Sequence, residues 1–191
     1  MVYGMIHPTA VVDAGAQLGA DVRVWHFVHI DTGAQIGAGT SIGQGCYIAA
    51  ISIGARCKIQ NQVSLYAGVV VEDDVFIGPS CVFTNVQRPR AHLSRRDQYA
   101  TTTIERGVTL GANATVVCGP TGRRIGSYAF VAAGAVVTKN VPPHAMMRGV
   151  PAVRVGWVCR CGAKLPNGTH VHCPDCGDNY HIHDERVMRV E

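Results

Sequence analysis

The sequence predicts an all-β fold in which short parallel strands wind into a solenoid, a parallel β-helix, over residues 6–141. The first observation is a six-residue period in branched apolar residues. The second is a stripe of smaller residues that keeps the same period four positions later. The third is composition: the 191 residues include 22 glycines, and only 16% are charged and 6% aromatic. Such a composition suits tight, repeated corners that exclude bulky side chains.

The apolar stripe runs in steps of six from Ile6 to Ile48, resumes one residue early at Ile53 and continues to Phe83. It returns over residues 104–116 and 125–137. A period of six matches no helix, and a single hexad buries too little surface to be stable alone. Successive coils must therefore stack to form one continuous core. The period leaves the handedness open, since general rules favour right-handed crossovers in about 98% of cases.

Three cysteines belong to the stripe of small residues. Cys46, Cys57 and Cys81 occupy positions that Ala, Val and Thr fill elsewhere in the repeat. Free cysteine in such a setting behaves as a small hydrophobic residue. We therefore expect these thiols in the core, neither binding metal nor acting as nucleophiles.

The repeat is interrupted first over residues 86–103, VQRPRAHLSRRDQYATTT. This stretch is the most polar part of the repeat region and contains Arg88, Arg90, Arg95 and Arg96. It is either a solvated insertion or an arm that reaches over a substrate, on this chain or on a neighbouring subunit. In the second case its guanidinium groups would bind phosphate or carboxylate.

At the second interruption Ile125 follows Val116 by nine positions, where the period gives six. If the first interruption replaces the end of the Phe83 hexad, Phe83 lies directly beneath Val116. Asn85 and Cys118 then share one corner, a coil apart. We expect a candidate site there, with the arginine-rich loop above it.

The tail, residues 157–191, has lost the six-residue period and contains two cysteine pairs, each followed by glycine. Four thiolates at such spacing predict a structural zinc ribbon, although the C-x-C of the first pair is tighter than usual. Metal would stabilise a segment too small to fold unaided. A disulfide-bonded tail is the alternative. The predicted ligands are Cys159, Cys161, Cys173 and Cys176, and one could be replaced by His170, His172, His181 or His183.

Four of the eight cysteines are scattered in the repeat region and four cluster near the C-terminus at metal-ligand spacing, which favours a protein of the reducing cytoplasm. The net charge of +4 is modest and spread along the chain, so we expect no nucleic-acid partner. There is no apolar run of 18 residues and no export signal at the N-terminus, so we expect no membrane association.

Several segments together resemble one enzyme family. They are residues 73–86 (DDVFIGPSCVFTNV) with Pro89-Arg90, 111–115 (GANAT), 133–139 (AGAVVTK) and 149–152 (GVPA). They resemble the nucleotide-sugar N-acetyltransferases of the hexapeptide-repeat acyltransferases, whose β-helix is left-handed with three hexads per coil. The similarity covers roughly residues 6–156, which predicts a catalytic domain over 1–156 and a separate zinc-ribbon-like unit over 157–191 that this family does not typically carry.

The resemblance implies an acetyl-CoA-dependent N-acetyltransferase in which the sugar amine attacks the thioester directly. The subgroup that acetylates the 3-amino group of UDP-2-acetamido-3-amino-2,3-dideoxyglucuronate is the most similar. Enzymes acting on dTDP-3-amino-6-deoxyhexoses are the alternative. Coenzyme A lies between neighbouring β-helices in this family, which implies a homotrimer, since triangular prisms pack around a threefold axis.

Site residues follow from the same resemblance. Asn85 matches the asparagine that orients the substrate amine; without the resemblance it would be a turn residue bonded to its own backbone. Substrate binding is expected from Thr84, Arg88 and Arg90. Cys118 is expected to line the site without acting as a nucleophile. The residues expected to bind coenzyme A are Gly111, Cys118, Gly119, Ala133, Gly134, Lys139, Arg148 and Arg154.

Two other functions are compatible with a six-residue solenoid. The γ-type carbonic anhydrases bind a catalytic metal through three histidines, and His26 and His29 stand in one hexad here. No second histidine pair has a matching distance. A non-enzymatic scaffold, or a ribbon that binds nucleic acid, is the other reading, and the tail's few aromatics argue against it.

Overall fold

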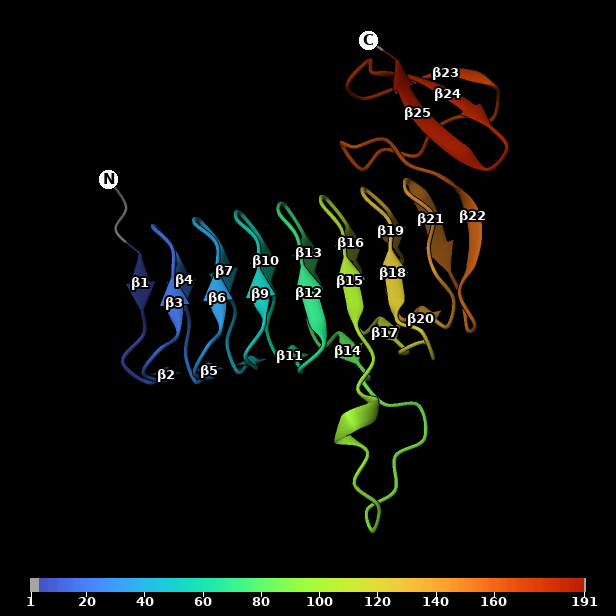
Figure 1. Ribbon diagram of the computed structural model, residues 1–191. Helices are drawn as coiled ribbons and strands as arrows, with labels where there is room; N and C mark the ends of the chain where they lie inside the picture. The colour runs from blue at the N-terminus through green and yellow to red at the C-terminus, as the bar shows by residue number, and fades with distance from the viewer. Residues whose placement is uncertain (1–3, 191) are drawn as a thin grey trace.

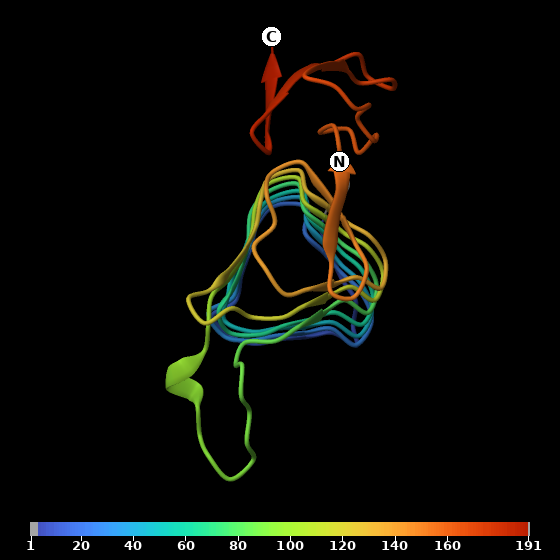
Figure 2. The ribbon, with the colours of Figure 1, turned by 90° about the vertical axis from the view of Figure 1, so that its right-hand side faces the viewer.

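The computed structural model describes residues 4–190, so the ends of the two predicted domains, residues 1–3 and 191, lie outside the described residues. Its body is a β-solenoid of triangular cross-section (Figure 2). Seen from its C-terminal end, the chain turns clockwise as it approaches the viewer, which is the left-handed sense. The predicted all-β, left-handed parallel β-helix is confirmed.

Three stacks of short parallel strands form the sides of the prism (Figure 1). The first stack contains β1 (Met5–Ile6), β4 (Arg23–Val24), β7 (Ser41–Ile42), β10 (Lys58–Ile59), β13 (Phe76–Ile77), β16 (Thr109–Leu110), β19 (Phe130–Val131) and β21 (Ala145–Arg148). The second contains β2 (Val11–Val12), β5 (His29–Ile30), β8 (Tyr47–Ile48), β11 (Ser64–Leu65), β14 (Val82–Phe83), β17 (Thr115–Val116) and β20 (Val136–Val137). The third contains β3 (Gln17–Leu18), β6 (Gln35–Ile36), β9 (Ser52–Ile53), β12 (Val69–Val71), β15 (Thr102–Ile104) and β18 (Arg123–Ile125).

The six-residue period sets the register between coils. In each strand the branched residue points inward and stacks on its equivalent in the next coil, as Ile59 does on Ile77 and Phe83 does on Val116. These side chains are almost fully buried and form one continuous core. The predicted placement of Phe83 beneath Val116 is therefore confirmed.

The corners are so tight that some of them admit only glycine. A Cβ on Gly37 would lie 2.4 Å from the carbonyl carbon of Gly54 in the coil above, and one on Gly111 would lie 2.4 Å from the amide nitrogen of Ala133. No real Cβ packs so closely against backbone. The high glycine content thus reflects the close approach of successive coils at these corners.

The three cysteines of the small stripe lie in the core, as predicted. Cys46, Cys57 and Cys81 are buried, and each thiol donates a hydrogen bond to a backbone carbonyl. Burial raises the pKa of both Cys46 and Cys81 to about 11. These thiols therefore stay protonated at neutral pH and are poor metal ligands and nucleophiles.

The C-terminal part departs from the solenoid. β22 (Val153–Trp157) runs antiparallel to β21. Beyond it lies a small antiparallel sheet of β23 (His170–His172), β24 (Asn179–His183) and β25 (Arg186–Val190). The tail has its own small core, centred on Tyr180, Leu165 and Val171. The helical segment that the structure describes, η1 (Arg96–Gln98), is a single 3-10 turn, and no helix in residues 4–190 could cross a membrane.

Truncating one inward side chain should destabilise the whole solenoid. We expect Ile77→Ala to lower the free energy of unfolding by about 2–5 kcal/mol, because the rigid coils above and below cannot close the cavity. Ile77 is fully buried, whereas Lys58 on the adjacent strand points outward. Denaturant unfolding at fixed protein concentration tests this, with Lys58→Ala as the control expected to change little. Equal effects of the two substitutions would contradict the assigned inward register.

Candidate functional sites

The predicted site lies at the corner between the second and third stacks. β14 ends at Phe83, and Thr84 and Asn85 form the corner that follows. The Thr84 hydroxyl accepts a hydrogen bond of 2.9 Å from the backbone N–H of Cys118 in the coil above. The prediction that Asn85 and Cys118 share one corner, a coil apart, is confirmed.

The arginine-rich loop leaves and re-enters the solenoid through a closed neck. The backbone N–H of Ala100 donates to the carbonyl of Asn85 over 2.8 Å, and that of Thr102 donates to the carbonyl of Gly68, also over 2.8 Å. Gly68 has a φ of +95°, and a Cβ there would lie 2.8 Å from the carbonyl oxygen of Ala100. Residues 86–99 therefore project well away from the prism (Figures 1 and 2).

The Asn85 side chain is partly exposed at the foot of this loop. Its amide nitrogen donates to the carbonyl oxygen of Ala67, in the coil below, over 3.3 Å. This bond differs from the self-capping turn that an isolated asparagine would form. Because the amide nitrogen faces Ala67, the amide oxygen is directed away from it and can accept a hydrogen bond from an amine.

The corner above Asn85 is built from Cys118, Gly119 and Pro120. A Cβ on Gly119 would lie 2.3 Å from the carbonyl oxygen of Gly122, so this position requires glycine. The Cys118 side chain has no exposed surface. The thiol of Cys118 is therefore buried in the corner and does not line the site, contrary to the expectation.

A hollow of about 340 Å³ lies between the loop and this corner. Of the two arginines expected to bind substrate, Arg88 lines the hollow, together with Gln98 and Gly119. Arg90 is exposed further out, where it forms an isolated bridge with Leu93. Thr84 contributes to the structure of the corner through its bond to Cys118.

Sequence reasoning missed Arg123, a second cation at this corner. Its Nε donates to the carbonyl of Val117 over 2.9 Å, and its backbone N–H donates to the carbonyl of Thr101 over 2.8 Å. Partial burial lowers the pKa of its guanidinium, which nonetheless stays charged at neutral pH. The only signal in the sequence was its place at the end of the second interruption, where nothing distinguished it from Arg124.

The residues expected to bind coenzyme A do not form one groove within a chain. Gly111, Ala133 and Gly134 lie at the corner between the first and second stacks, whereas Gly119 and Lys139 follow second-stack strands. β14, β17 and β20 lie between these two corners.

The two arginines of this set lie still further along, on β21 and β22. Arg148 ends β21 and is exposed. The Arg154 guanidinium contacts the Glu185 carboxylate at 2.6 Å and lies 4.2 Å from the centre of the Trp157 ring. It is thus already engaged by the tail.

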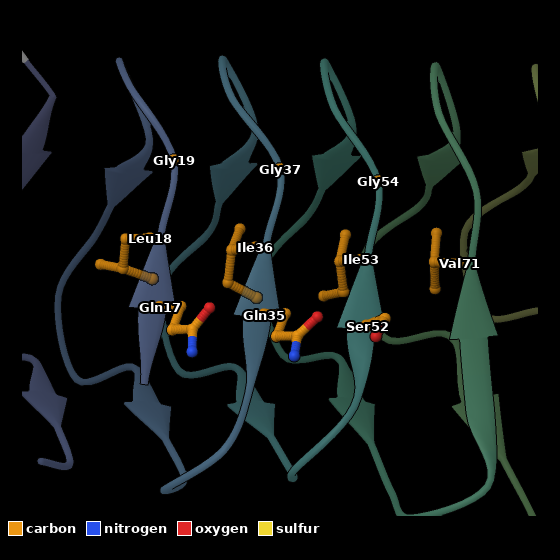
Figure 3. A pocket seen from close by; sticks show the side chains of 10 residues that line it. All are labelled: Gln17, Leu18, Gly19, Gln35, Ile36, Gly37, Ser52, Ile53, Gly54 and Val71. Atoms are coloured by element: carbon orange, nitrogen blue, oxygen red, sulfur yellow. The ribbon is translucent and has the colours of Figure 1, made fainter. Parts of the chain in front are cut away.

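The outer faces of the prism differ in polarity. On the second stack Val11 and Val82 are 55% and 50% exposed, and Phe27, at the corner beside it, is 63% exposed. The third stack presents a ladder of polar groups from Gln17, Gln35 and Ser52 over a shallow hollow (Figure 3). The second-stack face is therefore the better candidate for a protein contact.

Potential metal ligands converge at two places among residues 4–190. One group comprises Asp13, His29 and Asp31 on the surface, and the other comprises the four tail cysteines. His26 stacks on His7 instead of joining His29. Neither group contains the three histidines of a γ-type carbonic anhydrase.

The tail brings its four cysteine sulfurs together, and all lie within 4.8 Å of one another. The Sγ atoms of Cys159 and Cys176 are 3.4 Å apart, and those of Cys161 and Cys173 are 3.5 Å apart. A tetrahedral zinc with bonds of about 2.3 Å places its sulfurs about 3.8 Å apart, so the set fits. The four cysteines are free thiols, and no histidine joins the cluster.

Local backbone geometry explains the glycine after each cysteine pair. Gly162 and Gly177 have φ values of +97° and +76°, and their N–H groups donate to the carbonyls of Cys159 and Cys173. Burial raises the pKa of the Cys173 thiol, but hydrogen bonds from the backbone N–H groups of Cys176 and Asp175 outweigh it and bring that pKa to about 7. A thiol so placed readily becomes a thiolate ligand.

Comparison with protein families identifies the class of protein to which the chain belongs. The family described as bacterial transferase hexapeptide (six repeats) matches residues 15–51, and the hexapeptide repeat of succinyl-transferase matches residues 101–139. The repeat and the solenoid thus define a hexapeptide-repeat transferase.

A full-length relative narrows the class. The dTDP-3-amino-3,6-dideoxy-α-D-galactopyranose 3-N-acetyltransferase of Aneurinibacillus thermoaerophilus is 36% identical over 185 residues, which is 97% of this chain and 94% of the relative. The chain belongs to the hexapeptide-repeat nucleotide-sugar N-acetyltransferases. The match leaves six residues of this chain outside it (191 minus 185), so it extends into the tail, contrary to the expectation that the family similarity ends near residue 156.

Solved structures agree with this assignment. PerB of Caulobacter crescentus, crystallised with CoA and GDP-perosamine, is 25% identical with a TM-score of 0.50, and the similarity covers 81% of this chain. This chain corresponds to only 58% of PerB. The acetyltransferase VCA0836 of Vibrio cholerae, solved with acetyl coenzyme A, is 27% identical with a TM-score of 0.56 over 65% of this chain and 70% of its own.

The bond between Thr84 and Cys118 predicts the behaviour of two substitutions. We expect Thr84→Val to destabilise the protein by about 1–3 kcal/mol, because the N–H of Cys118 loses its acceptor in a partly buried corner. Thr84→Ser keeps the hydroxyl and should restore most of the loss. Thermal unfolding of the three proteins checks this. If serine and valine behaved alike, the hydroxyl would not be what supports the corner.

Proposed function

We propose that this protein transfers the acetyl group of acetyl-CoA to the 3-amino group of a dTDP-linked 3-amino-6-deoxyhexose. The observation that supports this choice is the match over almost the whole chain to an enzyme named for such a substrate. UDP-linked 3-amino-2,3-dideoxyglucuronate is the second candidate. It is favoured by residues 73–90, which resemble the enzymes for that sugar.

The active unit in this proposal is a homotrimer. The residues proposed to bind coenzyme A occupy two different corners that flank the second-stack face. When unlike corners of neighbouring chains meet, the contact is heterologous, and a rotation of about 120° between triangular prisms would close it into a threefold ring. One groove then contains Gly111, Ala133 and Gly134 from one chain and Gly119 and Lys139 from its neighbour. The projecting loop would reach the same groove.

The chemistry needs orientation more than a strong base. The sugar amine attacks the thioester carbonyl and an N–C bond forms. The C–S bond then breaks, and the coenzyme A sulfur leaves as a thiolate that takes up the proton lost by the amine, so the products are the amide and free coenzyme A. Holding the amine at the carbonyl converts a bimolecular step into a unimolecular one. In the proposal, the Asn85 amide oxygen accepts a hydrogen bond from the amine and directs its lone pair at the thioester. The Arg88 and Arg123 guanidinium groups would lie close enough to bind the negative charges of the nucleotide sugar.

The tail, residues 157–191, would carry one structural zinc ion held by its four cysteines. The support is the convergence of four sulfurs at near-tetrahedral spacing and the two glycine-closed turns that present them. Four thiolates leave no open coordination position, so the ion stabilises the fold and takes no part in acyl transfer.

The substrate assignment is tested by acceptor-dependent release of thiol from acetyl-CoA. We expect release with a dTDP-3-amino-6-deoxyhexose, and less with the UDP-3-amino-glucuronate. Preference for the UDP sugar would favour the second candidate. Absence of release with both sugars would contradict the proposed function.

Replacing the orienting asparagine should slow the reaction itself. We expect Asn85→Ala to lower kcat by about 100-fold, in the range of a lost positioning or transition-state contact, with a smaller change in the KM for either substrate. Asp21 stands at a corner of the first coil, away from both proposed binding corners, is exposed, and has a positive φ. Asp21→Gly suits that backbone and serves as the control. A kcat unchanged by Asn85→Ala would remove this residue from the active site.

The metal proposal predicts one zinc per chain in the purified protein. Cys173→Ser should abolish zinc binding and lower the melting temperature, because the tail's small core cannot hold it folded without the ion. Asp175→Asn changes an exposed residue inside the same turn and should retain full zinc. Zinc analysis and titration of free thiols give the answer. A zinc-free protein whose tail cysteines resist thiol reagents until reduced would establish disulfides instead.

A further inference from the structure

A column of rings connects the solenoid to the tail at the corner between the third and first stacks. The His144 ring stacks on that of Tyr128, one coil below, with centroids 5.3 Å apart. On the tail side His144 meets the edge of the Tyr180 ring at 5.5 Å. His144 is 7% exposed and Tyr180 is 1% exposed. Tyr180 belongs to β24 of the tail, and Figure 1 shows the tail over this end of the solenoid.

Tyr180 also touches the metal centre. Its hydroxyl lies 3.1 Å from the Sγ of Cys159 and accepts a hydrogen bond of 3.1 Å from the backbone N–H of Arg160. With Cys159 as a thiolate ligand, the hydroxyl donates to that sulfur. The same ring therefore contacts a metal ligand at one end and the solenoid at the other.

His144 is also hydrogen-bonded to the backbone of Val158, where the chain leaves the solenoid. Its Nδ1–H donates to the carbonyl of Val158 over 2.9 Å, and its own carbonyl accepts from the N–H of Val158 over 2.8 Å. Trp157, next to Val158, packs against both the solenoid core and the tail core and pairs with Ala145 across the β21–β22 hairpin. The end of β22 is thus fixed from two sides.

The hairpin so fixed carries two of the cations proposed for coenzyme A. Arg148 ends β21, and Arg154 lies in β22. Arg154 is held by the Trp157 ring and by Glu185, which belongs to the tail. The direction of the Arg154 guanidinium therefore depends on where the tail sits.

We propose that the tail is a metal-dependent clamp on the last coil. With its four cysteines bound to metal, the tail holds the β21–β22 hairpin through Tyr180 and His144 and so positions Arg148 and Arg154. Tyr180 is then a positioning residue that acts through His144. The part of this inference that concerns coenzyme A rests on the proposed function, whereas the mechanical part does not.

Hydrogen exchange tests the mechanical part on the full-length protein. We expect Cys173→Ser to speed backbone amide exchange across residues 145–157 by about tenfold, as local opening becomes easier. Tyr180→Phe keeps the ring and the zinc but loses the hydroxyl, and should speed exchange in the same segment by a smaller factor. Asp175→Asn should match the unmodified protein. Unchanged exchange over 145–157 in zinc-free Cys173→Ser would overturn the clamp.

Steady-state kinetics test the link to the cosubstrate. We expect Tyr180→Phe to raise the KM for acetyl-CoA by roughly threefold or more while kcat and the KM for the sugar change little, because the affected cations bind without taking part in the chemistry. A fall in kcat alone would contradict a role in cosubstrate binding. If the unmodified protein released no thiol at all, the proposed function would be contradicted. The hydrogen-exchange experiment would still test the clamp, because it does not depend on activity.

Discussion

The structure depends on the stacking of one inward branched side chain per strand on its equivalent in the coils above and below. Columns such as Ile42, Ile59, Ile77 and Leu110 are fully buried along the first stack. Each coil contributes too few such residues to be stable alone, so stability arises only between neighbours. A slip of one residue would turn the stripe outward, which fixes the register. Because the register is fixed, every corner residue has a defined neighbour in the next coil.

That frame explains why the candidate active site lies at an interruption. At a corner the chain can leave the stack without interrupting a column of inward side chains, provided that hydrogen bonds join the two ends of the excursion. Here the carbonyl of Asn85 accepts a hydrogen bond from the N–H of Ala100, and Phe83 and Ile104 stay in their columns on either side of the projecting loop, residues 86–99. The polar groups of the loop are thus added to a rigid base. Asn85 belongs to the solenoid corner and not to the loop, so the register of the coils fixes its position.

What the sequence could predict follows from the same physics. The period places Phe83 beneath Val116, and so Asn85 beside Cys118, once the first interruption is taken to replace the end of the Phe83 hexad. The irregular segments obey no such rule. Three features depend on three-dimensional paths with no periodic signature. They are the burial of the Cys118 thiol, the hydrogen bonds of Arg123 to the carbonyls of Val117 and Thr101, and the ion pair between Arg154 and Glu185. The convergence of the four tail cysteines could be predicted because tetrahedral metal ligation restricts the spacing of cysteine pairs in a sequence.

The nearest-neighbour character of a solenoid also limits how far the tail can act. A change in one repeat is felt mainly by the repeat it touches. The tail touches the last coil through His144 and Trp157, whereas Asn85 follows β14, which is separated from β20 by β17. Loosening the tail should therefore disturb the cations at the end of the prism and leave the orienting amide in place. A clamp built this way would affect cosubstrate affinity without affecting the chemical step, since the two depend on different coils of one stack.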